Sequence, residues 1–333
     1  MKFLVFTLTF LSSFSAHAAD ALYKISHRIP LSGPEGWDLL AVDPQSDRLF
    51  VTRSNRVDVI DLKKDAVIGT ITKGLDGAHG VAFVPNLKKG YITSGRTGKV
   101  VVFNLDTLQV QSEITAGDKP DVVLFDANSG KLFVFNSSGK SVTVINPEND
   151  AVVKTIPVSG EPEFGAVIGN NLYFNTEDNN SLGMIDTHEL VLKKTWPLPG
   201  CDGPTGMAAD IKAERIFSAC GNGVMVVSEA KTGKNIKNIP IGKGPDGSGF
   251  DDGYIFSSNG GSGDLSVIKV RDPNSFDVTQ TLSTQKGART MAINSVKHTI
   301  YTIAAKYAAA DPKAPHTRPA ILPGSVEILV LNR

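Results

Sequence analysis

The sequence predicts an all-β protein, and specifically a seven-bladed β-propeller. Beyond the N-terminal segment, short runs of Val, Ile, Phe and Tyr alternate with turns rich in Gly, Asn, Asp and Pro, which is typical of many short strands. Segments of about forty residues repeat along the chain, the period of a four-stranded propeller blade. A hydrophobic content of 41% in 333 residues is sufficient for a large core.

The first 18 residues have the pattern of a cleaved signal peptide. Lys2 precedes a short apolar run, and Ala16 and Ala18 form the small-x-small pattern of a cleavage site. We expect a single propeller domain over residues 19–333. No later segment approaches the run of about 20 apolar residues that a membrane-spanning helix needs, so we expect a periplasmic or secreted protein.

The second strand of each repeat carries an aromatic residue. It stands in runs such as "RLFVT" and "KGYIT", and it occurs seven times, which predicts seven blades. The seven aromatic residues are Phe50, Tyr91, Phe133, Tyr173, Phe217, Phe256 and Tyr301.

The third and fourth strands of the repeats show how the ring closes. An aliphatic residue opens each third strand, at Val57, Val100, Val142, Leu182, Val224, Leu265 and Val326. Only six fourth strands follow, at 66–71, 108–114, 151–156, 190–196, 234–239 and 276–282. The N-terminal run "ALYKISHRIPLSG" has the missing fourth-strand pattern, so we expect it to complete the last blade.

The repeats resemble those of a known family. The motif is a Gly, often a Pro, an apolar strand and a second strand of the form "rlyVtn", and here it reads "GWDLLAVDPQSDRLFVTRS" and "GAHGVAFVPNLKKGYITSG". It resembles the YVTN-repeat seven-bladed propellers, which include exported YncE-like bacterial proteins. The resemblance covers nearly all of residues 19–333 and implies the fold and a binding or interaction role, because one fold carries many functions.

One position, at the start of the innermost strand of every blade, is rich in ionisable residues. We call its occupants the ring residues, because seven such side chains should surround the mouth of the central channel. Six of the seven are ionisable and four are carboxylates. The ring residues are Asp38, His79, Asp121, Glu163, Thr205, Asp246 and Arg289.

The ring residues suggest a ligand site. His79, Asp38, Asp121 and Glu163 offer nitrogen and oxygen ligands suited to a divalent ion such as zinc, manganese or calcium, the one candidate cofactor. The alternative is a polar, water-filled mouth in which Arg289 pairs with Asp38 or Asp246.

Loops on the same face add further candidate ligand-binding residues. The loop 304–325 of the seventh blade is long, and long loops on a rigid scaffold often cover or recognise a ligand. It carries Lys306 and His316, while shorter loops carry Arg53 and Arg96, and Trp37 directly precedes a ring residue. A solvated, proline-rich extension is the alternative for the long loop.

The two cysteines, Cys201 and Cys220, fall on this face in one blade of an exported chain. That compartment permits a disulfide, and two buried thiols are the alternative.

Three functions remain open. We favour a protein that binds a small polar ligand, metal ion or metal complex at the channel mouth. The resemblance also implies a lactonase-like hydrolase as an alternative, with His79 as general base and Arg289 stabilising negative charge, although no standard catalytic motif occurs. The third is a scaffold for another exported or outer-membrane protein. The net charge of zero, from 34 basic and 34 acidic residues, argues against nucleic acid, and we expect a monomer.

Overall fold

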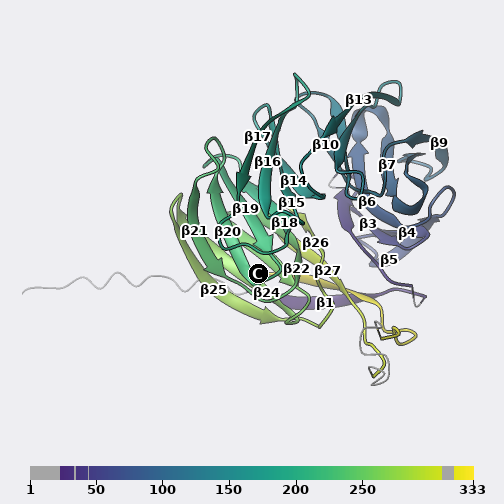
Figure 1. Cartoon of the computed structure of the whole chain (residues 1–333). Helices are drawn as coiled ribbons and strands as arrows, with labels where there is room; N and C mark the ends of the chain where they lie inside the picture. The colour runs from purple at the N-terminus through teal and green to yellow at the C-terminus, as the bar shows by residue number, and fades with distance from the viewer. Residues whose placement is uncertain (1–22, 34, 44, 310–318) are drawn as a thin grey trace, which may run out of the picture.

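The computed structural model describes residues 23–33, 35–43, 45–309 and 319–333. Within these ranges the strands β1 to β28 form seven four-stranded antiparallel sheets, arranged as a ring (Figure 1). The described residues contain no α-helix, and their two 3₁₀ turns are Pro85–Leu87 and Gly95–Thr97. The predicted seven-bladed propeller is therefore confirmed.

The first six blades follow the chain, each from its innermost to its outermost strand. Blades one to three comprise β2 Leu40–Asp43, β3 Arg48–Arg53, β4 Arg56–Asp61 and β5 Ala66–Ile71; β6 Ala78–Val84, β7 Lys89–Ser94, β8 Lys99–Asn104 and β9 Val110–Thr115; and β10 Pro120–Asp126, β11 Lys131–Asn136, β12 Ser141–Asn146 and β13 Ala151–Pro157. Blades four to six comprise β14 Pro162–Ile168, β15 Asn171–Thr176, β16 Ser181–Asp186 and β17 Val191–Pro197; β18 Pro204–Asp210, β19 Arg215–Cys220, β20 Val224–Glu229 and β21 Asn235–Pro240; and β22 Pro245–Asp251, β23 Tyr254–Asn259, β24 Asp264–Asp272 and β25 Ser275–Ser283.

The seventh blade joins the two ends of the chain. Its order from the centre outward is β26 Met291–Asn294, β27 Thr299–Ala304, β28 Glu327–Asn332 and β1 Lys24–Pro30. β1 pairs antiparallel with β28, with Ile29 opposite Ile328, and in Figure 1 it runs beside the strands of this blade. The expected closure by the N-terminal strand is confirmed.

The core lies between the blades rather than at one centre. The seven aromatic residues predicted for the second strands all lie there and are at most 4% exposed. Seven apolar clusters each join neighbouring blades, because both faces of a blade pack on adjacent blades and alternate residues point to opposite faces. This arrangement leaves the innermost strands facing a common channel.

The long loop of the seventh blade separates β27 from β28, as expected. An antiparallel bridge between Tyr307 and Ile321 forms the described base of this loop, whose described parts extend beyond the strands of the ring in Figure 1. A Cβ atom added to Gly287 would lie 2.9 Å from the Tyr307 hydroxyl, so the loop base lies against the segment leading into β26.

No helix among the residues that the structure describes is long and apolar enough to cross a membrane.

Candidate functional site

The seven ring residues line one cavity of about 520 Å³, which we call the inner cavity. In blades two to six the ring residue is the second residue of the innermost strand, whereas Asp38 and Arg289 lie just before the shorter strands β2 and β26. The fold therefore brings together the seven side chains that the alignment of the repeats identified, although they are far apart in sequence.

Hydrogen bonds between blades fix the backbone of the ring residues. The Thr93 hydroxyl on β7 donates to the carbonyl oxygen of Asp121 in the next blade. The Asn175 amide donates to the Thr205 carbonyl oxygen at 3.0 Å. Each donor stands two residues after the aromatic residue of its own second strand. The same strand therefore supplies an aromatic side chain to the core and a hydrogen bond that positions a ring residue of the next blade.

Asp38, His79 and Asp121 form a compact cluster in the cavity wall. Their ligand atoms all lie within 4.8 Å of one another, a spacing that suits a metal ion. The Nδ1 atom of His79 is hydrogen-bonded to Asp38 and lies 3.7 Å from Oδ1 of Asp121. The predicted fourth metal ligand, Glu163, lines the same cavity but does not belong to this cluster.

Arg289 links two of the ring carboxylates. Its guanidinium lies 3.1 Å from Oδ1 of Asp38 and donates to Oδ2 of Asp246 at 2.5 Å. Arg289 therefore pairs with both Asp38 and Asp246, the two partners that the alternative interpretation of a polar mouth offered. These ion pairs tie the first, sixth and seventh blades together at the channel.

Asp38 and His79 favour their charged forms. Burial disfavours the charge on Asp38, but the hydrogen bonds and charges of His79 and Arg289 outweigh it and lower its pKa. Burial likewise opposes protonation of His79, yet the carboxylates of Asp38 and Asp121 raise its pKa above the usual value. His79 therefore holds its proton more tightly than a free histidine does, and a metal ion would have to displace that proton to bind the ring nitrogen.

The other three carboxyl groups resist ionisation. Burial raises the pKa of Glu163 to about 9, and the nearby carboxylates of Asp121 and Asp246 add to the rise. Burial and the charge of Asp38 raise the pKa of Asp121 to about 6. Burial also raises the pKa of Asp246 to about 6, although Arg289 opposes the change. Burial, reinforced by the neighbouring carboxylates, therefore makes these three carboxyl groups hold their protons to a higher pH than ordinary carboxyl groups do.

A second cavity of about 600 Å³, the outer cavity, adjoins the first. The two share four lining residues, namely Asp38, His79, Lys119 and Arg289. Trp37 and Arg96 line the outer cavity as predicted, although Arg96 is exposed and pairs with Asp76 at 2.7 Å. A Cβ atom on Gly95 would lie 2.6 Å from Nε2 of His79, so this nitrogen lies next to the 3₁₀ turn of blade two.

The remaining loop predictions do not converge on the mouth. Arg53 is fully buried and pairs with Asp58 at 3.4 Å. Its guanidinium also donates to the carbonyl oxygens of Gly33 and Glu35 in the segment before β2. Lys306 lines a separate cavity of about 570 Å³ with Arg28 and Glu327. His316 lies outside the described residues. Arg53 is therefore a structural residue, and the described part of the long loop does not line either mouth cavity.

The inner-cavity residues that sequence reasoning missed include three with charged or aromatic side chains: Lys119, Phe164 and Glu177. Lys119 and Phe164 each lie within two residues of a ring residue, so a wider window around the aligned position would have included them. Glu177 lies in the turn between β15 and β16 and comes close only through folding. Its carboxylate would contact a Cβ atom on Gly203 at 3.9 Å.

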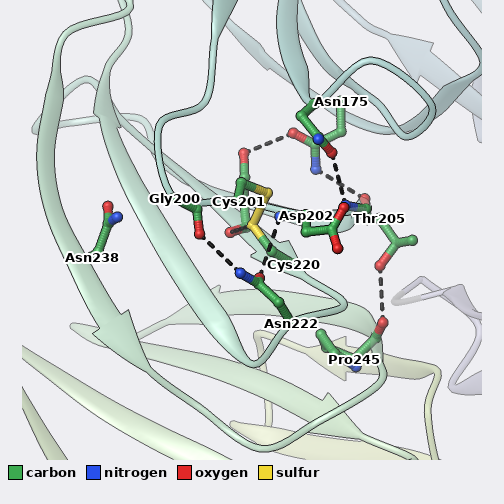
Figure 2. Close-up of a disulfide and its surroundings, with 12 residues drawn as sticks. Asn175, Gly200, Cys201, Asp202, Thr205, Cys220, Asn222, Asn238 and Pro245 are labelled. Atoms are coloured by element: carbon green, nitrogen blue, oxygen red, sulfur yellow. Dashed lines mark hydrogen bonds between the residues drawn. A yellow bond between two sulfur atoms is a disulfide. The ribbon is translucent and has the colours of Figure 1, made fainter.

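A disulfide joins Cys201 and Cys220 on this face, with their Cα atoms 5.4 Å apart (Figure 2). It connects the segment leading into β18 with the end of β19. The side chain of Asn222 supports the same segment, donating to the Gly200 carbonyl oxygen at 3.0 Å and accepting from the Asp202 amide at 3.3 Å. The expected bridge is thus present and braces the loop before Thr205.

Comparisons with known proteins agree with the fold and leave the function open. A protein family described as "Domain of unknown function (DUF5074)" matches residues 46–200, slightly less than half of the chain. This range includes β3 to β17, so it lies within the first four blades. A comparison with curated protein sequences finds no match.

Three solved structures are similar over most of this chain. Hydrazine synthase of Kuenenia stuttgartiensis aligns with a TM-score of 0.71 and 14% identity, over 89% of this chain and 98% of that chain. U3-55K aligns with a TM-score of 0.74 and 10% identity, over 91% and 97%. The WD40 repeats of RRP9 align with a TM-score of 0.75 and 10% identity, over 94% and 98%. At these identities the likeness shows the propeller fold alone.

Proposed function

We propose that this protein binds a small polar ligand or a metal ion at the mouth of its central channel. One observation carries the proposal: all seven ring residues line a single cavity, and three of them place possible metal ligands within 4.8 Å of one another. A cavity of about 520 Å³ has the volume of ordinary small-molecule sites. The propeller itself is consistent with a binding or scaffold role.

The chemistry of the cluster favours a divalent cation as one occupant. The ion would replace the proton on Nδ1 of His79 and be held by Asp38 and Asp121. Arg289, bonded to the second oxygen of Asp38, would keep that carboxylate in place. Because the ion competes with protons for these groups, its affinity is expected to rise with pH.

Native mass spectrometry with elemental analysis tests this proposal on mature protein purified without a chelator. We expect wild type to carry an ion or small molecule that His79→Ala loses. His188→Ala is the matched control, because His188 is an exposed histidine in the turn between β16 and β17. An empty wild-type protein that also binds no added Mn²⁺ or Zn²⁺ would refute the metal-ion part.

A hydrolase of the lactonase type is the second candidate. The hydrogen bond from Asp38 to Nδ1 of His79 supports it, because a carboxylate that fixes one nitrogen leaves Nε2 to act as a general base. Hydrolysis of a lactone panel by wild type, abolished in His79→Ala and retained in His188→Ala, would establish catalysis. Absence of turnover in all three proteins would remove this candidate.

We also propose that the protein is exported to the periplasm or secreted. The signal-peptide pattern of residues 1–18, which lie outside the described residues, and the Cys201–Cys220 disulfide support this location, because disulfides persist in oxidising compartments. An exported or outer-membrane partner protein remains part of this proposal, and a stable complex recovered with the mature protein would identify it.

A further inference from the structure

The inner cavity is lined by acidic and basic side chains that lack protein partners. Lys119 and Glu177 are exposed, whereas Glu163 is half-buried and, with a pKa of about 9, keeps its proton at neutral pH. The described residues form no hydrogen bond or ion pair with the Lys119 ammonium group, nor with the side-chain carboxyl groups of Glu163 and Glu177. By contrast, Arg289 pairs with Asp38 and Asp246 in the same cavity. Charged groups that face a common cavity without pairing are suited to a ligand that carries the opposite charges.

We propose that the occupant of this cavity is a small amino carboxylate, whose ammonium group lies against Glu163 and Glu177 and whose carboxylate binds Lys119. This inference rests on the proposed function, because it assumes that the channel mouth is a binding site. Phe164 lines the cavity beside Glu163 and supplies an aromatic surface for the ammonium group and its carbon chain. Thr205 lies in the same wall, where its hydroxyl donates to the Pro245 carbonyl oxygen and can only accept from a ligand.

The backbone at Lys119 makes a clean test possible. Lys119 has a φ of 51°, in the left-handed region, where a lysine is less stable than a glycine. In other blades glycine stands two residues before the ring residue with positive φ, at Gly77, Gly203, Gly244 and Gly287. Lys119→Gly therefore removes the ammonium group without imposing backbone strain.

Lys88→Gly provides the matched control. Lys88 also has a left-handed backbone, with a φ of 53°, but it pairs with Asp106 at 2.7 Å and lines neither mouth cavity. Both substitutions remove one positive charge and relieve the same backbone conformation. If only Lys119→Gly weakens ligand binding, the loss is therefore due to the ammonium group of Lys119 in the cavity and not to the lower net charge of the protein.

Isothermal titration calorimetry of the mature protein, with the series from glycine to 6-aminohexanoate, tests the proposal. Each compound is compared with the alkylamine and the carboxylate of the same chain length. We expect one member of the series to bind at least about tenfold tighter than both analogues, the gain given by a single added charged contact. Lys119→Gly should reduce its affinity to that of the amine, Glu177→Gln should reduce it to that of the carboxylate, and Lys88→Gly should leave it unchanged.

The possible failures are distinct. If no compound in the series exceeds both analogues, or if Lys119→Gly binds as tightly as Lys88→Gly, the amino carboxylate proposal is wrong. If elemental analysis still finds an ion that His79→Ala loses, the proposed function survives that failure. If the protein is empty in every experiment, both proposals are wrong. Thermal melting of Glu177→Gln separates a lost contact from a lost fold.

Discussion

At the scale of single residues, Gly95 shows how closely the mouth is built around His79. A Cβ atom there would lie 2.6 Å from Nε2 and 2.8 Å from Cδ2 of the imidazole, closer than real Cβ atoms come. Gly95 is buried in a 3₁₀ turn, so its backbone has little room to move away. The position of the imidazole therefore depends on the absence of a side chain in a neighbouring loop.

We predict that Gly95→Ala displaces His79 and weakens binding of an added divalent ion by tenfold or more, with a loss of about 1–3 kcal/mol in unfolding free energy from overpacking. The imidazole resonances of His79 in an NMR spectrum and a Mn²⁺ titration measure both effects. Gly36→Ala is the control, because a Cβ atom there meets no atom within 4 Å. Unchanged His79 resonances in Gly95→Ala would contradict the packing described.

Glu163 should make the stability of the protein depend on pH. Its pKa is about 9 in the folded protein, against 4.5 in an unfolded chain, because burial and the facing groups Asp121, Asp246 and Glu177 disfavour its charge, with Lys119 opposing. The folded state holds this proton more tightly, so its stabilising contribution is complete below about pH 4.5 and is lost as pH rises toward 9. Stability should therefore fall with rising pH.

The measurement is calorimetric melting of wild type and Glu163→Gln at pH 5, 7 and 9. We predict that the Tm of wild type falls relative to that of Glu163→Gln across this range, because glutamine does not titrate. Parallel Tm curves for the two proteins would show that Glu163 ionises at its ordinary pKa.

At the scale of elements, the disulfide of blade five adds a covalent link to a segment that hydrogen bonds with Asn222 also hold. It connects residues 19 positions apart, and Cys201 lies in the irregular segment before β18. The Thr205 hydroxyl donates to the Pro245 carbonyl oxygen at 2.9 Å, so this segment also contacts the next blade (Figure 2). The disulfide therefore bears on the geometry of the mouth as well as on stability.

We predict that replacing both cysteines with serine lowers the unfolding free energy by about 2–4 kcal/mol, since a closed loop of this length restricts the unfolded chain. Urea unfolding of the wild type and the double variant measures the loss. Dithiothreitol should lower the midpoint of wild type and leave that of the double variant unchanged. Equal sensitivity of both proteins to the reductant would contradict a structural role for the bridge.

At the scale of the whole molecule, the ring is closed by a strand from the opposite end of the chain. Ile29 on β1 is 1% exposed and packs in an apolar cluster that joins the last blade to the first. Its partners include Ile328 on β28 and Ile60 on β4. Because each blade is supported by both neighbours, damage at this junction should weaken every blade together.

We predict that Ile29→Ala lowers the unfolding free energy by about 2–5 kcal/mol while unfolding stays a single transition. Val153→Ala on β13 is the control, because Val153 is 48% exposed and its loss should change stability by less than about 0.5 kcal/mol. Chemical unfolding followed by both circular dichroism and tryptophan fluorescence tests the prediction. Two separate transitions in Ile29→Ala would show that the last blade unfolds independently of the ring.

The sequence by itself determined the fold, the number of blades, the closing strand and the identity of the ring residues. The reason is that a propeller repeats one local unit, so that the aromatic at Tyr91 or Tyr301 and the polar residue at His79 or Arg289 have equivalent environments. Register and burial in each blade follow from that alternation. Because each position of the repeat occurs seven times, its place in the blade can be inferred with far more support than that of any single residue.

Which charges pair and which remain free depends on the tertiary structure. Arg53 and Arg96 look equivalent in sequence, yet the first is fully buried among carbonyl oxygens and the second is exposed at the outer cavity. Lys119 and Glu177 enter the inner cavity from different loops, and no periodic pattern relates them. Pairing depends on distances of a few ångströms between separate blades, and a repeat pattern fixes only the blade itself.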